Sequence, residues 1–263
     1  MVSIRPPAVA GLFYPAETQA LSALITEQLV ANSLSTHKQP IAIIAPHAGY
    51  IYSGPIAATV FQTLQAHRNT IKRVVIIGPS HRYYFHGLAL SSADEFETPL
   101  GTVPIDKTTQ ELLLSATDSK ILDQAHQNEH CIEVQLPFLQ SVLTDFSIIP
   151  IVTGETSAES VTDVIDLFAT DHETLIVISS DLSHYHDYHS AQQIDTQTSQ
   201  SIITLDYNSI DSHQACGHTA INGLLLAATN YQLTASILDQ RNSADTAGNK
   251  DSVVGYGAYL FEA

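Results

Sequence analysis

The chain has 263 residues, with 10 Lys and Arg against 27 Asp and Glu, and a formal net charge of −17 at pH 7. This acidity argues against binding to nucleic-acid phosphates or to an anionic membrane surface. No apolar run approaches the roughly 18 residues that a membrane helix requires, and the N-terminus lacks the apolar core of a signal peptide. We therefore predict a cytoplasmic protein with a single α/β domain over residues 1–263 and both cysteines reduced.

Apolar residues at helical spacing and short β-branched runs closed by Gly or Pro alternate along the chain. In chain order, the pattern predicts an irregular arm over 5–16, helix 17–31, strand 41–45, helix 55–66, strand 73–77, strand 87–91, a weak region with a turn at 99–101, helix 106–114, helix 128–143, strand 146–152, helix 157–169, strand 174–179, helix 191–205, helix 219–229, strand 234–238 and strand 253–261. This alternation predicts a layered α/β/α fold with a mostly parallel central sheet.

Two prolines and a serine refine these elements. Pro137 is expected to kink or break helix 128–143, because proline lacks the backbone N–H that an interior helical position uses. For the same reason, Pro150 is expected to place its strand at a sheet edge or a bulge. Ser157, followed early by Glu159, has the character of a helix N-cap.

Three strands end in residues that can bind a metal or carry a proton. Strand 41–45 leads through a proline to His47, strand 73–77 leads through Gly-Pro to His81, and strand 174–179 leads to Asp181 and His184. Ligands of open α/β sheets bind beyond the carboxyl ends of the strands, so we expect these groups to converge in one crevice. The alternative is that the first two are turn histidines that happen to follow strands.

Asp181 and His184 also have two interpretations. Asp181 could accept a hydrogen bond from a ligand imidazole while His184 acts as a general acid or base, or as a further ligand. Alternatively, Asp181 caps a helix and His184 belongs to a solvated cluster, which is our interpretation of His186 and His189.

Three further motifs are less specific. His130 and Glu133 would share one helical face and could form a proton relay, although the same spacing is common on surface helices. Cys216, beside Gly217, is interpreted as a structural cysteine. Asp245, in the long polar loop before the last strand, could complete a site of two histidines and one carboxylate for non-haem Fe(II), or simply form a solvated turn.

In combination, these motifs resemble the Memo family, most closely its prokaryotic branch called AmmeMemoRadiSam system protein B. The resemblance covers nearly the whole chain and rests on Ala45-Pro-His-Ala-Gly-Tyr50, Gly78-Pro-Ser-His81, Asn128-Glu-His130 with Glu133, Ser179-Ser-Asp181 with His184, Cys216-Gly217 and Val254-Gly-Tyr256. It implies a fold similar to class III extradiol dioxygenases, which hold Fe(II) with two histidines and a glutamate.

The resemblance also implies roles for individual residues. His47 and His81 match two metal ligands, Asp181 and His184 match residues around the same pocket, and His130 lies in the segment that lines the cleft. The third ligand departs from the family pattern. Where animal members have a cysteine in the loop before the last strand, this chain offers Asp245 or, in a different alignment, Thr246.

Three functions remain open at this point. The first is a redox or dioxygenase-like protein that uses Fe(II), or copper, for a small-molecule or peptide ligand, with Tyr50, Tyr52 and Tyr83 as pocket walls. The second is a non-catalytic accessory protein that works with AMMECR1-like and radical SAM partners, as the family name implies. The third is a hydrolase in which a zinc-bound water is the nucleophile.

Overall fold

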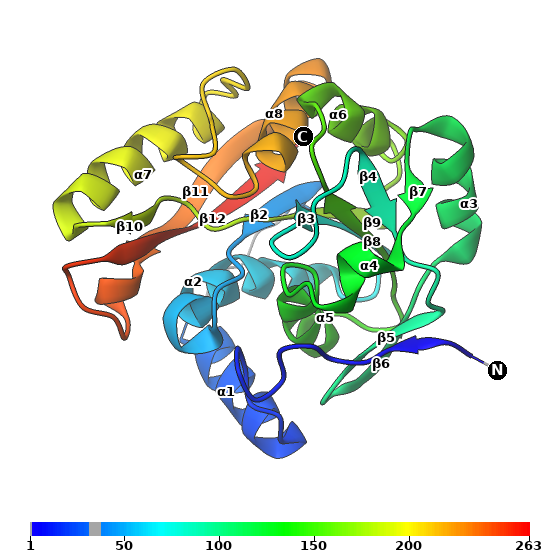
Figure 1. Ribbon diagram of the computed structural model, residues 1–263, viewed down its shortest axis with the longest axis horizontal. Coiled ribbons are helices and arrows are strands. Elements are labelled where there is room, and N and C mark those ends of the chain that lie inside the picture. Colours follow the sequence, from blue (N-terminus) through cyan, green and yellow to red (C-terminus); the bar gives the residue numbers. More distant parts are fainter. Residues whose placement is uncertain (1, 32–37) are drawn as a thin grey trace.

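The computed structural model describes residues 2–31 and 38–263, and its centre is a large twisted sheet (Figure 1). The strand order is β10-β12-β2-β9-β3-β8-β4-β7, and β11 also pairs with β12. These strands are β2 (Ala42–Ala45), β3 (Arg73–Pro79), β4 (Leu88–Leu90), β7 (Lys120–Ile121), β8 (Ser147–Thr153), β9 (Thr174–Ser179), β10 (His184–His186), β11 (Thr234–Asn242) and β12 (Val253–Glu262).

The middle of the sheet is parallel, and both of its faces are buried. Strands β2, β9, β3 and β8 all run in the same direction. Alternate side chains of a strand point to opposite faces, so Ile43 and Val177 enter one core while Ile44 and Ile176 enter the other. Burial on both faces explains why these strands are almost continuously aliphatic.

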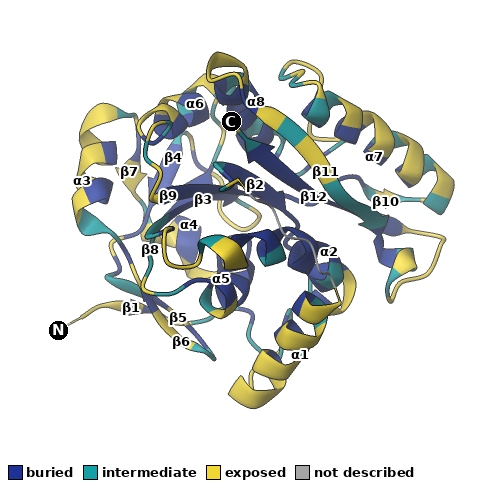
Figure 2. Cartoon of the chain, turned by 180° about the vertical axis from the view of Figure 1, so that it is seen from behind, coloured by how far each residue is buried: buried dark blue, intermediate teal, exposed yellow. Residues whose placement is uncertain are grey.

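Helices cover the two faces of the sheet. One face packs against α1 (Thr18–Val30), α2 (Tyr50–Gln62) and α5 (Leu136–Val142), and the other packs against α3 (Lys107–Ala116), α6 (Ala158–Asp166), α7 (Tyr188–Ile203) and α8 (His218–Asn230). Figure 2 shows the buried strands between helices whose outer faces are exposed. The predicted layered α/β/α fold with a parallel centre is confirmed. Among the described residues, no helix combines the length and apolar character needed to cross a membrane.

Two sequence predictions about this framework are wrong. Residues 128–143 do not form one helix; α4 (Asp123–Gln127) is followed by a turn, a 3-10 segment (Glu133–Gln135) and α5. The Glu129 carboxylate accepts hydrogen bonds from the backbone N–H groups of His130 and Cys131, which a continuous helix would use internally. Pro150 lies on an interior strand, because β8 has β3 on one side and β4 on the other. β4 pairs only with Val152 and Thr153, so the missing N–H of Pro150 breaks no hydrogen bond to it.

The N-terminal arm contributes to a second, small sheet that the sequence pattern did not predict. Strand β1 (Ile4–Arg5) pairs with β5 (Glu95–Thr98), which forms a hairpin with β6 (Gly101–Pro104). Two-residue and four-residue strands are too short to leave a readable alternation of apolar and polar residues. In Figure 1 the arm runs along the edge of the molecule beside this hairpin.

The arm is attached to the core through the buried Glu133 carboxylate. Glu133 forms an ion pair with Arg5 and accepts hydrogen bonds from the Val9 N–H at 3.0 Å, the Ala8 N–H at 2.7 Å and the Tyr14 hydroxyl at 2.6 Å. Its side chain is fully buried. A buried carboxylate whose donors all come from one distant segment fixes the position of that segment.

We expect Glu133→Ala to lower the free energy of unfolding by about 3–5 kcal/mol, because the variant leaves the Arg5 guanidinium buried without its partner. Chemical denaturation measures this loss, with Glu111→Ala on the exposed face of α3 as the control. A loss below about 1 kcal/mol, as for an exposed ion pair, would contradict the structural role.

Candidate metal centre

Three parallel strands deliver a histidine or an aspartate to one place. His47 follows β2, His81 follows β3 and Asp181 follows β9, and the carboxyl ends of parallel strands meet at one edge of the sheet. The ring centroids of His47 and His81 are 5.0 Å apart. The convergence expected from the sequence is therefore present in the structure.

Asp181 joins the end of β9 to the end of β2. Its Oδ1 accepts hydrogen bonds from the backbone N–H of His47 at 2.8 Å and of Ala48 at 3.3 Å. The expected bond from Asp181 to a ligand imidazole is absent among the described residues, so this carboxylate positions the His47 backbone instead. Burial raises the pKa of Asp181 above its usual value, although the nearby His184 acts in the opposite direction.

The Nδ1 atom of each of the two strand-end imidazoles is occupied. Nδ1 of His47 lies 2.9 Å from Ser179 Oγ, and this hydroxyl donates its own proton to the Cys131 carbonyl at 2.6 Å. Ser179 must therefore accept, which places the His47 proton on Nδ1. Nδ1 of His81 lies 2.9 Å from Glu129 Oε1, and a carboxylate can only accept. Both Nε2 lone pairs remain available to a metal.

Cys216 supplies the third donor atom at this position. One ring nitrogen of His47, one of His81 and the Sγ of Cys216 lie within 4.8 Å of one another, and Cys216 Sγ is 3.3 Å from His47 Nε2. Burial, and after it the charge of Asp181, raises the pKa of the Cys216 thiol to about 12. A bound cation would reverse this effect, because a metal binds the thiolate and displaces its proton.

The residue after Cys216 has to be small. Gly217 donates its N–H to Ser180 Oγ at 2.9 Å, and a Cβ at position 217 would lie 2.7 Å from Ser180 Cβ. This close approach brings the start of α8 against the end of β9 and carries Cys216 to the histidines. The interpretation of Cys216 as structural missed this placement, and its signal was the Cys-Gly pair directly before a helix.

The structure does not bring Asp245 to the histidines. Asp245 ends a short 3-10 segment (Ser243–Asp245), where its Oδ2 accepts the Asn242 backbone N–H at 2.9 Å and its Oδ1 accepts the Tyr188 hydroxyl at 2.7 Å. Both oxygens are thus engaged in local capping and tethering. Thr246, the alternative, donates its hydroxyl to the Ser243 carbonyl.

Glu129 connects two histidines of the centre, and sequence reasoning did not single it out. Its Oε2 accepts the His81 backbone N–H at 2.6 Å, and Nδ1 of His130 lies 3.1 Å from its Oε1. Burial acts to raise the pKa of Glu129, but contacts with the imidazoles of His130 and His81 outweigh it and hold the pKa well below its usual range. A permanent negative charge therefore lies behind both rings.

His130 is the third imidazole of the cluster. Its ring centroid is 4.5 Å from that of His81 and 5.3 Å from that of His47. Burial, and then the proximity of His81 and His130, lowers the pKa of His47 well below its usual value, so His47 stays neutral. His130 and Glu133 do not form the expected relay, because Glu133 is engaged by the N-terminal arm.

A cavity of about 540 Å³ opens above these groups. The lining residues come from the three strand ends, the N-terminal arm, α2, the turn after α4, β10, the loop before β12 and β12 itself: Phe13, His47, Ala48, Gly49, Tyr52, His81, His130, Asp181, His184, Tyr185, Ser243, Gly248, Asn249, Ser252, Val254 and Tyr256. Of the three tyrosines expected to wall it, only Tyr52 does so; Tyr50 is buried and bonded to the Val134 carbonyl, and Tyr83 lines a smaller neighbouring cavity that also reaches Cys216.

The turn that carries Asp181 and His184 depends on another buried carboxylate. Asp195, on α7, accepts the Ser183 backbone N–H at 3.0 Å, and a Cβ on Gly255 would collide with its Oδ2. Burial raises the pKa of Asp195 to about 6. Sequence reasoning could not identify Asp195, because on an amphipathic helix it resembles any surface aspartate.

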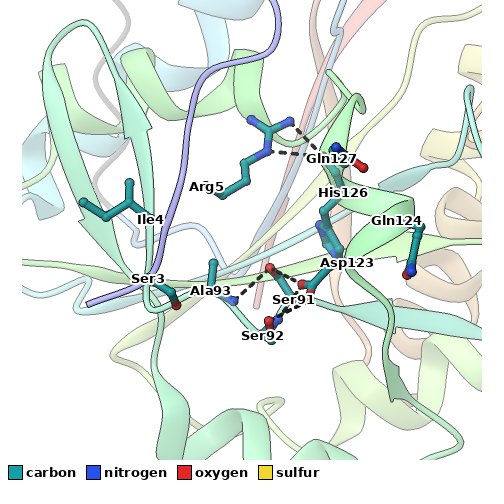
Figure 3. Close-up of a pocket in the computed structure, with 10 residues that line it drawn as sticks. All are labelled: Ser3, Ile4, Arg5, Ser91, Ser92, Ala93, Asp123, Gln124, His126 and Gln127. Carbon is teal, nitrogen blue, oxygen red and sulfur yellow. Dashed lines mark hydrogen bonds between the residues drawn. The ribbon is translucent and has the colours of Figure 1, made fainter. Parts of the chain in front are cut away.

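A second cavity, of about 320 Å³, lies beside the N-terminal arm (Figure 3). Its polar groups bind one another: Arg5 donates to the His126 carbonyl, and Asp123 accepts from the Ser91 hydroxyl and the Ser92 N–H. These bonds hold the arm to the end of α4 and hold the start of α4 to the segment that follows β4. The cavity contains none of the clustered histidines and is not our candidate site.

Known proteins are similar to this chain over nearly its whole length. Residues 5–260 match the family model described as Memo-like protein. The chain is 36% identical over 279 residues to a MEMO1 family protein of Thermotoga petrophila, covering 98% of this chain and 99% of that protein. It is 34% identical over 275 residues to a MEMO1 family protein of Methanosarcina mazei, covering 99% of this chain and 100% of that protein.

Among solved structures, the crystal structure of uncharacterized protein JW3007 from Escherichia coli K12 is similar, with a TM-score of 0.53. The match covers 84% of this chain and 100% of that chain at 11% sequence identity. At that identity the likeness shows the fold alone, and it agrees with the layered α/β architecture.

We expect Asp195→Asn to raise the free energy of unfolding at pH 7 by about 1–3 kcal/mol. Between the ordinary pKa of 3.8 and the folded-state pKa of about 6, the folded protein retains a proton that the unfolded chain has released. Stability therefore falls as the pH rises through this window, and the amide removes the effect. Denaturant titrations from pH 4 to pH 7 test this, with the exposed Asp163→Asn as control; an unchanged slope in Asp195→Asn would refute it.

Proposed function

This chain belongs to the Memo-like protein family, and we propose that it is a metal-dependent redox protein whose metal is held by His47, His81 and Cys216. One observation carries the proposal: three donor atoms on three separate segments lie within 4.8 Å of one another. The Nδ1 bonds of the two imidazoles support it, because they fix the tautomer that presents Nε2 to a metal.

The donor set fits a transition metal rather than Mg²⁺ or Ca²⁺. Two imidazoles and a thiolate are ligands for iron, copper or zinc, whereas Mg²⁺ and Ca²⁺ prefer oxygen. The expected carboxylate ligand favoured Fe(II); a thiolate in its place extends the choice toward copper. When bound, such a metal supplies electron transfer and Lewis acidity to a ligand in the cavity.

The residues around the metal and the ligand would then have different roles. Glu129 and Ser179 orient the two imidazoles, and Asp181 fixes the backbone of His47. His130 lines the cavity beside both metal-binding histidines, and its Nδ1 lies 3.1 Å from the Glu129 carboxylate, which can accept a proton or return one. His130 is therefore our candidate for the group that moves a proton to or from the ligand, and His184, on another wall, is the second.

Zinc hydrolysis is a second candidate function. Three protein ligands below an open cavity are also the arrangement of catalytic zinc sites, in which the remaining position holds a water nucleophile. Turnover that needs no oxygen and no electron acceptor would favour it over the redox function.

We expect His47→Ala, His81→Ala and Cys216→Ser each to retain less than about a tenth of the wild-type metal, because three ligands are the minimum for such a site. Elemental mass spectrometry on anaerobically purified protein measures this. Asp245→Asn is the matched control and should keep its metal, since Asp245 lies in a local cap.

Two results would contradict this assignment. Metal content near wild type in both His47→Ala and Cys216→Ser would remove the site, and a binding or accessory role in the same cavity would take its place. Loss of metal in Asp245→Asn would instead restore the carboxylate as a ligand.

We expect Glu129→Gln to weaken metal binding by roughly 10–100-fold without removing any ligand, because the neutral amide no longer orients and polarises the His81 ring. Competition against a chromophoric chelator measures the affinity. The control is the exposed Glu155→Gln, which should bind metal as wild type does. Equal affinity in Glu129→Gln would show that the Glu129 contact has no bearing on the metal.

A further inference from the structure

The cavity above the proposed metal has an aromatic wall and, among the described residues, no lysine or arginine in its lining. The aromatic side chains come from three regions of the chain: Phe13 from the arm, Tyr52 from α2, and Tyr185 and Tyr256 from β10 and β12. Tyr52 is 39% exposed and Tyr185 is 77% exposed. Exposed aromatic rings gathered around one opening are a feature of ligand sites rather than of ordinary surface.

Tyr185 keeps its position at an energetic cost. Its φ is +62°, in the left-handed region that bulky residues avoid. Two other non-glycine residues with positive φ, Leu205 and Gln232, follow the ends of α7 and α8, where this conformation is usual. Tyr185 lies instead within a strand, at a break in the pairing register between β10 and β12. Such bulges redirect a side chain beside a functional site, and here the side chain is a tyrosine where glycine would be unstrained.

Tyr256 provides a hydroxyl group at the same cavity. The residue is only 2% exposed, and its hydroxyl takes part in none of the hydrogen bonds formed among the described residues. Burial, together with the charge of Asp181 and the proximity of Tyr52 and Tyr185, raises the pKa of Tyr256 well above its usual value. The phenol is therefore neutral, and its hydroxyl can donate a hydrogen bond to a ligand in the cavity that Tyr256 lines.

The charges around the cavity select against one class of ligand. Asp181 is acidic, the chain carries a net charge of −17, and no lysine or arginine of the described residues lines the cavity. An anionic group of a ligand would lose its hydration there without gaining a lysine or arginine as its partner.

We propose that the cavity binds an aromatic molecule that carries no anionic group at the end that lies away from the metal. Tyr52 and Tyr185 pack against the ring of this molecule, and the Tyr256 hydroxyl donates a hydrogen bond to it. This inference rests on the proposed function, since it takes the ligand to bind above the metal. The recognition itself comes from the three tyrosines, which are not metal ligands.

Three probes with the same phenol ring and different tails test the proposal: p-ethylphenol, tyramine and p-hydroxyphenylpropionate. Ligand-observed NMR titrations give their affinities for the protein as purified, with the metal content measured on the same sample. We expect the neutral and cationic probes to bind at least about tenfold more tightly than the carboxylate. Equal or tighter binding of the carboxylate would overturn the proposal.

Two variants separate recognition from structural effects. Tyr256→Phe removes one hydroxyl that has no partner in the described chain, and it should weaken p-ethylphenol binding about tenfold with unchanged stability. Tyr185→Gly should weaken binding while the protein becomes no less stable, because glycine tolerates the positive φ. Tyr231→Phe, outside the cavity, is the control. Wild-type affinity in both cavity variants would overturn the proposal, as would weaker binding that only follows lower stability.

The same titrations in His47→Ala keep the two proposals apart. If that variant loses its metal but ranks the three probes as wild type does, both proposals stand. If it keeps its metal and the ranking, the metal site fails and the aromatic site stands. If the carboxylate becomes the tightest probe whether or not metal is retained, the aromatic site fails by itself.

Discussion

The buried carboxylate of Glu129 is the contact on which the candidate centre depends. It accepts hydrogen bonds from the backbone and Nδ1 of His81 and from the backbone N–H groups of His130 and Cys131. Charge-assisted bonds of this kind are among the strongest available to a protein. One side chain therefore ends α4, prevents the following residues from continuing a helix, and directs two imidazoles toward the same cavity. The chemistry of the site and the break in the backbone have a single cause.

The same arrangement recurs at the other buried acids of this chain. Asp181 accepts the His47 N–H, Asp195 accepts the Ser183 N–H, and Glu133 accepts two N–H groups of the N-terminal arm. In each case a carboxylate binds the backbone of a segment distant in sequence. Such bonds fix loops that have too few apolar residues to be held by packing. The strand ends can therefore be polar, as a reactive site requires, and still be rigid.

The sequence alone predicted what depends on local pattern. Continuous aliphatic runs identify the buried strands. The histidines that follow two of these strands are expected at the same edge of a parallel sheet. Cys216 could not be found in this way, because it follows no strand and reaches the site only through the packing of Gly217 against Ser180. The prediction of Asp245 as a metal ligand relied on the residue type alone. The side chain of an aspartate near a turn most often accepts hydrogen bonds from nearby backbone N–H groups, and here Asp245 caps a 3-10 segment. Glu133 and Glu129 are both buried acids of one motif, and only tertiary structure shows which of them faces the histidines.

Several residues of the candidate centre lower the free energy of unfolding. Burial raises the pKa of both Asp181 and Asp195, so keeping these carboxylates charged at neutral pH opposes folding. Tyr185 adds backbone strain, because its φ of +62° lies in the left-handed region. Selection for stability alone would replace Tyr185 with glycine and Asp195 with asparagine, each a small change. Their presence at one edge of the sheet is what a site maintained for binding and chemistry would show, because a rigid polar cavity can be built only at the expense of the surrounding fold.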